Sequence, residues 1–219
     1  MVTAGGGEAP ETALAAVQRA HRVCTRCVDA GLLDVANPVF SGHAGQRILL
    51  VGQAPGPVEH DLTRPFAGRA GRQLMRWFVR AGVAPEEEVR RRVYMTAMTT
   101  CFPGRTADGR GDRRPSAREV ALCSSWLDAV IGLLRPRLIL PVGTLAIGRF
   151  VAGRGLDECV GRLFDASGGE VEAAGDPPAV FPLPHPSGQS RWLNDAAHAA
   201  RLDAALARLG GLMAWAETP

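Results

Sequence analysis

The sequence contains no lysine, since all 25 of its basic residues are arginine. This absence excludes mechanisms that depend on a lysine Schiff base, a lysine general base or the lysine of a phosphate-binding P-loop. Long apolar runs are also missing, because no stretch approaches the roughly 20 residues that a membrane-spanning helix needs. The opening residues, MVTAGGGEAP, lack the charged-then-apolar order of a secretion signal. We therefore expect a cytoplasmic protein with no membrane partner.

The composition is that of a folded protein. A chain of 219 residues can form one large domain or two small ones around a sizeable core. With 46% hydrophobic and 21% charged residues, the chain has the character of neither a disordered nor a fibrous protein. The net charge of +3 permits contact with a polyanion without demonstrating it, because one face can be basic while the average is nearly neutral.

Strand and helix patterns alternate along the chain. Short apolar runs predict four strands, at 47–52, 93–96, 138–143 and 179–183. Helical periodicity predicts four helices, at 11–33, 68–81, 116–134 and 193–209. This order predicts a three-layer α/β/α sandwich around a central, mainly parallel four-stranded sheet. We expect a single domain over 11–212, with a disordered leader at 1–10 and a tail at 213–219.

Polar clusters follow the predicted strands, at 53–66, 97–101 and 185–194. In parallel sheets, ligands gather where loops leave the carboxyl ends of the strands. These clusters are therefore the candidate functional loops. Residues 104–115, rich in Gly, Arg and Asp, are expected to form an exposed loop.

Four of the five cysteines have a spacing that suits a shared metal. Cys24 and Cys27 form a CxxC pair on adjacent helical turns, Cys101 follows a predicted strand, and Cys123 lies on the next predicted helix. A Cys₄ zinc site, a [4Fe–4S] cluster, and a redox pair with two buried thiols all fit this pattern. Cys159 lacks ligand spacing and is interpreted as a spare thiol.

Five short motifs occur in a fixed order: GQAPG at 52–56, RPF at 64–66, GRAG at 68–71, VYMT at 93–96 and HPS at 185–187. Together they resemble the uracil-DNA glycosylase superfamily, most of all its iron–sulfur branch, often called family 4. The order of the four cysteines also matches that branch, and the resemblance covers roughly residues 20–209. It implies the family's α/β fold and a [4Fe–4S] cluster, with four ligands: Cys24, Cys27, Cys101 and Cys123.

The resemblance implies a monofunctional DNA glycosylase that flips out and excises uracil, or another deaminated base, from DNA. Such an enzyme acts in base-excision repair as a monomer and leaves an abasic site for downstream abasic-site repair enzymes. Cleaving the N-glycosidic bond develops positive charge on the sugar and negative charge on the leaving base. With no lysine side chain to form a Schiff base with the sugar, we expect no further strand cleavage.

The matching positions imply roles for individual residues. Phe66 corresponds to the family's phenylalanine that stacks on the extruded base, and His185 to the histidine that stabilises the anionic base. Gln53 and Ala54 lie in the loop whose backbone amides contact the base and where water is positioned. The loop after the last strand would press into the duplex, with five candidate DNA contacts: Ser187, Gly188, Arg191, Trp192 and Leu193.

The chain departs from the family pattern at two positions. Gln53 stands where the family usually has glutamate, so Glu59, which matches a second acidic position, becomes the candidate catalytic carboxylate, with Asp61 as a weaker rival. After Thr96 the family normally has an asparagine that reads the uracil edge, and this chain has Ala97. A site without that amide lacks a direct means of accepting uracil and rejecting cytosine. Thr96, Thr99 or a backbone group could substitute.

Four further expectations concern these departures, the cysteines and the loop at 105–118. Gln53 and Ala97 favour, as an alternative, a catalytically weak or inactive lesion-binding protein with the same fold and cluster. A zinc module with an unrelated α/β activity is a third hypothesis. A related branch that crosslinks to uracil-DNA carries a histidine in this loop, and this chain has none, so we expect no crosslinking. The loop's arginines would face phosphates.

Overall fold

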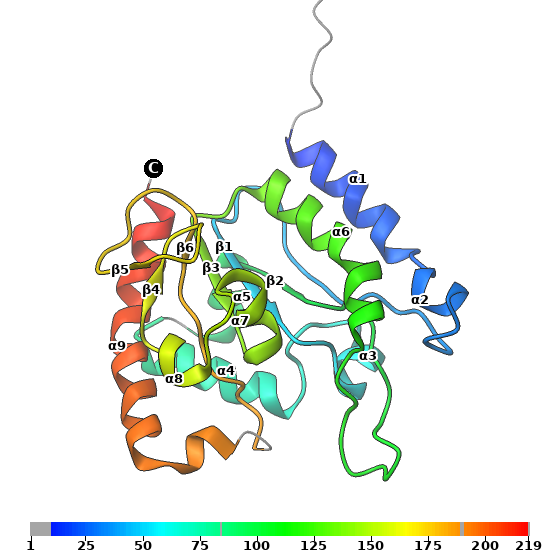
Figure 1. Ribbon diagram of the computed structural model, residues 1–219. Coiled ribbons are helices and arrows are strands. Elements are labelled where there is room, and N and C mark those ends of the chain that lie inside the picture. The colour runs from blue at the N-terminus through cyan, green and yellow to red at the C-terminus, as the bar shows by residue number, and fades with distance from the viewer. Residues whose placement is uncertain (1–9, 84, 189–190, 219) are drawn as a thin grey trace, which may run out of the picture.

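The computed structural model shown in Figure 1 describes residues 10–83, 85–188 and 191–218. The strands are β1 (Ile48–Gly52), β2 (Val93–Ala97), β3 (Leu138–Pro141), β4 (Leu163–Phe164), β5 (Glu170–Val171) and β6 (Ala179–Val180). The α-helices are α1 (Pro10–Arg22), α2 (Arg26–Asp29), α3 (Pro57–Leu62), α4 (Arg69–Arg80), α5 (Glu86–Arg92), α6 (Ala117–Leu134), α7 (Thr144–Phe150), α8 (Leu156–Cys159) and α9 (Ala196–Glu217). A short 3₁₀ helix, η1 (Arg191–Asn194), precedes α9.

The strands form one sheet in the order β2-β1-β3-β6-β4-β5. The pairs β1–β2, β1–β3 and β3–β6 are parallel, which confirms the predicted parallel centre. The strands β4 and β5 extend the sheet antiparallel to it, giving six strands instead of the expected four. Each of these two strands has only two residues, too few for an apolar alternation to be visible in the sequence.

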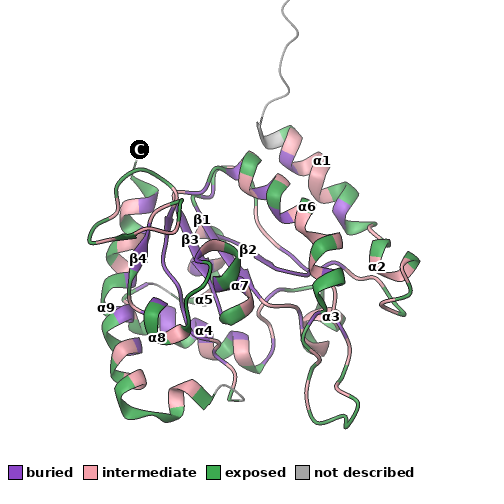
Figure 2. Cartoon of the chain, viewed as in Figure 1, coloured by how far each residue is buried: buried purple, intermediate pink, exposed green. Residues whose placement is uncertain are grey.

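Helices cover both faces of the sheet, as a three-layer sandwich requires. Side chains alternate between the faces along β1, so that Ile48 and Leu50 pack with α4, α5 and α9, while Leu49 and Val51 pack with α1, α6 and α7. All four of these side chains are fully buried. Figure 2 shows the buried strands running between helices whose outer faces are exposed. The predicted fold class is confirmed.

Two predicted boundaries are wrong. The helix expected over 11–33 is broken, because α1 ends at Arg22 and α2 begins at Arg26, with Cys24 in the link. Both pieces contact α6. The tail expected at 213–219 belongs to α9 as far as Glu217, since Met213 and Ala216 are buried in the core. Of the expected leader, residues 1–9 lie outside the described residues.

The helices α6 and α9 begin with side-chain caps. Ser116 and Glu119 form a capping box at α6, in which Ser116 Oγ accepts from the Glu119 N–H and Glu119 Oε2 accepts from the Ser116 N–H. Asp195 caps α9 by accepting from the N–H groups of Ala197 and His198. In the described part of the chain, no helix is long and apolar enough to cross a membrane.

Candidate active site and cysteine cavity

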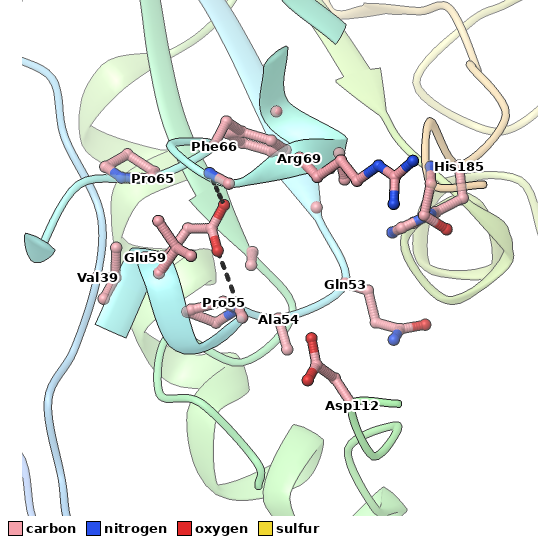
Figure 3. Close-up of a pocket in the computed structure, with 18 of the residues that line it drawn as sticks. Val39, Gln53, Ala54, Pro55, Glu59, Pro65, Phe66, Arg69, Asp112 and His185 are labelled. Carbon is pink, nitrogen blue, oxygen red and sulfur yellow. Dashed lines mark hydrogen bonds between the residues drawn. The ribbon is translucent and has the colours of Figure 1, made fainter. Parts of the chain in front are cut away.

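A pocket of about 600 Å³ lies at the edge of the sheet where the parallel strands end. The segments that follow β1, β2 and β6 all line it, together with part of the loop before α6 (Figure 3). Parallel strands bring their carboxyl ends to one edge, so loops distant in sequence meet there. The polar side chains lining the pocket are Gln53, Glu59, Arg69, Thr96, Asp112, Arg113, His185 and Ser187.

His185 lines this pocket with one ring nitrogen already occupied. Its Nδ1 accepts from the backbone N–H of Ser187 at 3.2 Å and lies 2.8 Å from the Ser187 hydroxyl. Because Nδ1 accepts, the neutral ring carries its proton on Nε2 and can donate from there. Burial lowers the pKa of His185 from its ordinary value of 6.5, which keeps the ring neutral at pH 7. The ring packs closely on Gly143, where a Cβ would lie 3.2 Å from Cδ2.

Phe66 lines the same pocket and also packs against the core. Its backbone is left-handed, with φ of 55°, a conformation that non-glycine residues seldom adopt and that often marks a functional turn. The ring lies over Gly52 at the end of β1, where a Cβ would come within 3.0 Å of its Cζ. Arg90 of α5 holds the turn by donating to the carbonyls of Pro65 at 3.0 Å and Phe66 at 3.4 Å.

Glu59 has a structural task in this pocket. Its Oε1 accepts from the backbone N–H of Gly68 at 2.7 Å, and its Oε2 accepts from that of Gly56 at 3.1 Å. Figure 3 draws both bonds, which tie the start of α3 to the start of α4. Both carboxylate oxygens are therefore engaged with backbone amides, as in a helix cap. The catalytic role expected for Glu59 remains a prediction, and its rival Asp61 is exposed on α3.

The base-binding residues expected from the sequence meet at the ends of β1 and β2. Gly52 pairs with Ala97 across these strands, so Gln53 and Ala54 follow directly beside Ala97. Gln53, Ala54, Thr96 and Ala97 all line the pocket, and Thr96 and Ala97 are buried. Ala97 supplies a methyl group there and no amide. Thr99 instead lines the second cavity described below.

The residues expected to contact DNA lie along the chain segment that leaves the pocket. Ser187 and Gly188 line it, whereas residues 189–190 lie outside the described residues. Arg191 is exposed on η1. Trp192 stacks on His198, with ring centroids 4.3 Å apart, and its Nε1 donates to Asp157 at 2.6 Å. Trp192 and Leu193 both pack against the core. Their role as a wedge in the duplex stays a prediction.

The structure adds three side chains to which the sequence patterns assigned no role in the pocket. Arg69, the first residue of α4, extends across the pocket toward His185 (Figure 3). Asp112 and Arg113 come from the loop expected to be exposed at 104–115, and both line the pocket. Arg69 lies within the GRAG motif, but the motif gave no indication of what its side chain would contact. For Asp112 the sequence offers no signal beyond its acidic type.

The four cysteines with ligand spacing surround a second, small cavity of about 20 Å³. Cys24 and Cys27 come from the α1–α2 region, Cys101 follows β2, and Cys123 lies on α6. All four are free thiols, as is Cys159, which is buried at the end of α8 and does not line this cavity. The spacing in the sequence therefore predicted which cysteines the fold brings together.

The thiols are close enough to influence one another. Burial raises the pKa of Cys101 to about 12, and the neighbouring Cys123, Cys27 and Cys24 add to that rise. The pKa of Cys27 is also raised, mainly by burial and to a smaller extent by the neighbouring Cys123. If all four thiols lost their protons, the thiolates would repel one another in so small a space. Deprotonation of all four therefore requires a cationic group between them.

Two neutral polar side chains lie against the sulfur atoms. Trp126 Nε1 donates to Cys24 Sγ at 3.3 Å, and Thr100 Oγ1 lies 3.7 Å from Cys123 Sγ. Among the described residues, no three Cys, His, Asp or Glu side chains converge closely enough to hold a single metal ion. Four cysteine thiols around one cavity match the number and type of ligands that a [4Fe–4S] cluster takes. The residues present therefore fit that group.

The chain is similar in sequence to known proteins of one superfamily. A sequence model of the uracil DNA glycosylase superfamily matches residues 40–209. The chain is 31% identical over 151 residues to a type-4 uracil-DNA glycosylase of Thermotoga maritima, covering 68% of this chain and 69% of that one. It is 29% identical over 154 residues to a type-4 uracil-DNA glycosylase of Pyrobaculum aerophilum, covering 69% and 70%.

A type-5 uracil-DNA glycosylase of Pyrobaculum aerophilum is 33% identical over 115 residues, which cover 48% of each chain. The family match spans most of the chain and includes every strand of the sheet. It also includes both loops that carry Phe66 and His185. The chain therefore belongs to the uracil DNA glycosylase superfamily.

Proposed function

We propose that this protein is a monofunctional DNA glycosylase that excises uracil, or another deaminated base, and leaves an abasic site. The observation that carries the proposal is the shared pocket of Phe66 and His185, which offers an aromatic face and a neutral hydrogen-bond donor to one bound group. Membership of the superfamily and the names of the type-4 relatives support it. The product calls for downstream enzymes that process abasic sites.

Capture of the base is the first step. A base inside a duplex must be turned out of the stack before any side chain can reach its glycosidic bond. Phe66 offers its ring as a stacking partner for that base, and the left-handed turn held by Arg90 fixes the ring in place. Base–aromatic stacking contributes about 1–3 kcal/mol and tolerates different bases. Stacking therefore holds the base without selecting it.

Departure of the base is the step assigned to His185. As the N-glycosidic bond breaks, its electron pair moves onto the base, whose oxygen becomes negatively charged. The Nε2–H of neutral His185 donates to that oxygen, and the contact strengthens as the charge develops, which lowers the barrier. The Ser187 N–H secures the tautomer that makes this donation possible. Because the chain lacks lysine, no lysine side chain can form a Schiff base with the sugar.

The cysteine cavity would hold a [4Fe–4S] cluster on Cys24, Cys27, Cys101 and Cys123. When bound, the cluster supplies covalent cross-links between the α1–α2 region, the segment after β2 and α6. This chain's own contribution is to gather four half-buried thiols around one cavity, to donate a hydrogen bond from Trp126 Nε1 to Cys24 Sγ, and to place the Thr100 hydroxyl beside Cys123 Sγ. We assign the site a structural role, separate from the base pocket.

A second candidate function is that of a lesion-binding protein without turnover. It is favoured by Ala97, which places a methyl group in the pocket where the family has an amide, and by Gln53 in place of a carboxylate. Such a protein would bind uracil-containing DNA tightly and with strong salt dependence, because phosphate contacts dominate affinity. It would release no base.

One assay separates these two functions. Oligonucleotides carrying one uracil, hypoxanthine or xanthine, single- or double-stranded, are incubated with excess protein, and abasic sites are revealed by alkaline strand cleavage. We expect release of at least one of these bases, and no strand cleavage before alkali. Binding without release from any substrate would support the lesion-binding function, and neither binding nor release would refute both.

A further inference from the structure

The pocket contains two acidic side chains among its described lining residues, and they are placed differently. Glu59 uses both carboxylate oxygens to accept backbone N–H groups, at 2.7 Å from Gly68 and 3.1 Å from Gly56. Releasing either bond would leave a backbone amide without its partner at the start of a helix. Both oxygens of Glu59 are therefore occupied in joining the start of α3 to the start of α4.

Asp112 is the other acidic side chain, and one of its oxygens faces the pocket wall. Its Oδ1 pairs with Arg105 Nη1 at 3.2 Å, while a Cβ on Gly56 would lie 3.2 Å from its Oδ2. Figure 3 shows the carboxylate directed toward Gln53 and Ala54, from the side of the pocket opposite Phe66. The side chain is 42% exposed, so water can reach it. The pair with Arg105 is exposed as well, and such pairs are weak.

The loop that carries Asp112 is anchored at the neighbouring residue. Arg113 donates to the Pro103 carbonyl at 2.9 Å and to both oxygens of Glu119 at 2.7 Å. Glu119 is buried in the first turn of α6, and its bidentate pairing with Arg113 holds its pKa at about 2. The Arg113 N–H also donates to the Gly104 carbonyl at 2.8 Å, closing the loop. Asp112 is therefore adjacent to a fixed point of the scaffold.

We propose that Asp112 is the carboxylate that orients the attacking water and accepts its proton. The assignment rests on the proposed glycosylase function. The water oxygen forms a bond to the sugar C1′ as the C1′–N bond breaks, and the electron pair of that bond leaves with the base, which accepts from His185. The water proton passes to Asp112, whose negative charge also stabilises the positive charge on the sugar.

The test compares Asp112→Asn with Asp128→Asn, which removes an exposed carboxylate on α6 that pairs with Arg149, as Asp112 pairs with Arg105, and that does not line the pocket. Single-turnover base release and DNA affinity are measured for both. We expect Asp112→Asn to slow release by about 10²–10⁴-fold, the usual range for a general base, with affinity within about threefold of wild type. Asp128→Asn should match wild type in both.

A third variant addresses the possibility that Asp112 only supports the loop. Asp112→Ala, assayed with added formate, should recover part of the lost rate in proportion to formate concentration, because a free carboxylate can replace the missing one. Loop damage would not respond to formate. The assignment of Asp112 is overturned if Asp112→Asn releases the base at the wild-type rate, or if Asp112→Ala is slow and formate does not restore its rate. Either result leaves the proposed glycosylase function standing. A wild-type protein that releases no base overturns the glycosylase function and this assignment together.

Discussion

The two cavities of this molecule share a segment of chain but differ in construction. Residues 96 and 97 line the pocket that contains Phe66 and His185, the base pocket, whereas residues 99–101 line the cysteine cavity. The first cavity holds about 600 Å³ and is lined by polar groups from loops far apart in sequence, while the second holds about 20 Å³ between four thiols. An open pocket lined by both apolar and polar groups suits reversible binding and chemistry, and a small, half-buried thiol site suits a permanent cross-link.

The ion pair of Arg113 and Glu119 joins the two regions. Arg113 lines the base pocket and Glu119 lines the cysteine cavity, four residues before Cys123 on the same helix. A substitution at the cysteines should therefore affect the base pocket only indirectly, by disturbing α6 and the Arg113–Glu119 pair. Changes inside the pocket should leave the cysteine site intact.

Removal of a cysteine ligand should have the largest effect. Cys123→Ser should abolish iron binding and the broad visible absorption near ~400 nm of protein purified without oxygen, since the cluster needs four thiolates. Loss of the cross-link should also lower Tm by on the order of 5–10 °C. Iron analysis, absorption spectra and thermal denaturation measure these changes.

The matched control for that variant is Cys159→Ser, which changes a thiol outside the cavity. It should retain about four irons per chain. A Cys123→Ser protein with full iron content, or a wild-type protein with one zinc, would contradict the assignment of the cluster.

His185→Ala should reduce single-turnover base release by about 10²–10³-fold, the usual cost of removing one donor to a developing anion. DNA affinity should change far less, because the contact strengthens only as the base departs. Iron content should stay at the wild-type level. The exposed His43 offers the control, since His43→Ala should leave the rate unchanged. Equal losses of rate and affinity in His185→Ala would indicate a positioning role instead.

Ala97→Asn should change which base the pocket prefers. Ala97 lines the pocket beside Gly52, so an asparagine there presents an amide to the bound base. A well-placed amide pair discriminates between bases by about 1–3 kcal/mol, or about 5–150-fold in relative rate. Release of uracil should rise relative to release of hypoxanthine, with Ala107→Asn on the exposed loop as control. An unchanged ratio would show that other groups read the base.

The smallest expected effect is a pH dependence of stability. Burial lowers the pKa of His185 below 6.5, so below that pH the unfolded chain binds a proton that the folded chain does not. Stability should therefore fall as the pH drops from 6.5 through the lowered pKa, and less so in His185→Gln. His21, whose pKa burial lowers to about 4, contributes equally to both proteins and cancels. Parallel Tm curves for the two proteins between pH 8 and 5 would disprove the shift.

Much of the fold could be predicted because its causes are local. Four apolar runs and amphipathic patterns identified the parallel centre of the sheet and the main helices. The break after Arg22 was not visible, because residues 23–25 contain neither the glycine nor the proline that usually marks a helix end. The end of α9 was missed because Gly210 and Gly211 follow Leu209, and glycine usually marks the end of a helix, although Met213 and Ala216 beyond them are buried.

The site was predictable only where a motif marked it. His185 and Phe66 lie in the motifs HPS and RPF, and both line the pocket. The two-amide engagement of Glu59 depends on the N–H of Gly68, nine residues away, which spacing does not reveal. Asp112 reaches the pocket because Arg113 pairs with Glu119, a tertiary contact that a Gly- and Arg-rich loop does not indicate.

The most direct test of the account is a crystal structure of the protein with duplex DNA that contains a non-hydrolysable uracil nucleotide. We predict that the base lies outside the helix, stacked on Phe66, with a base oxygen about 3 Å from His185 Nε2. A base that stays in the duplex, or one that is bound away from Phe66 and His185, would contradict the central claim.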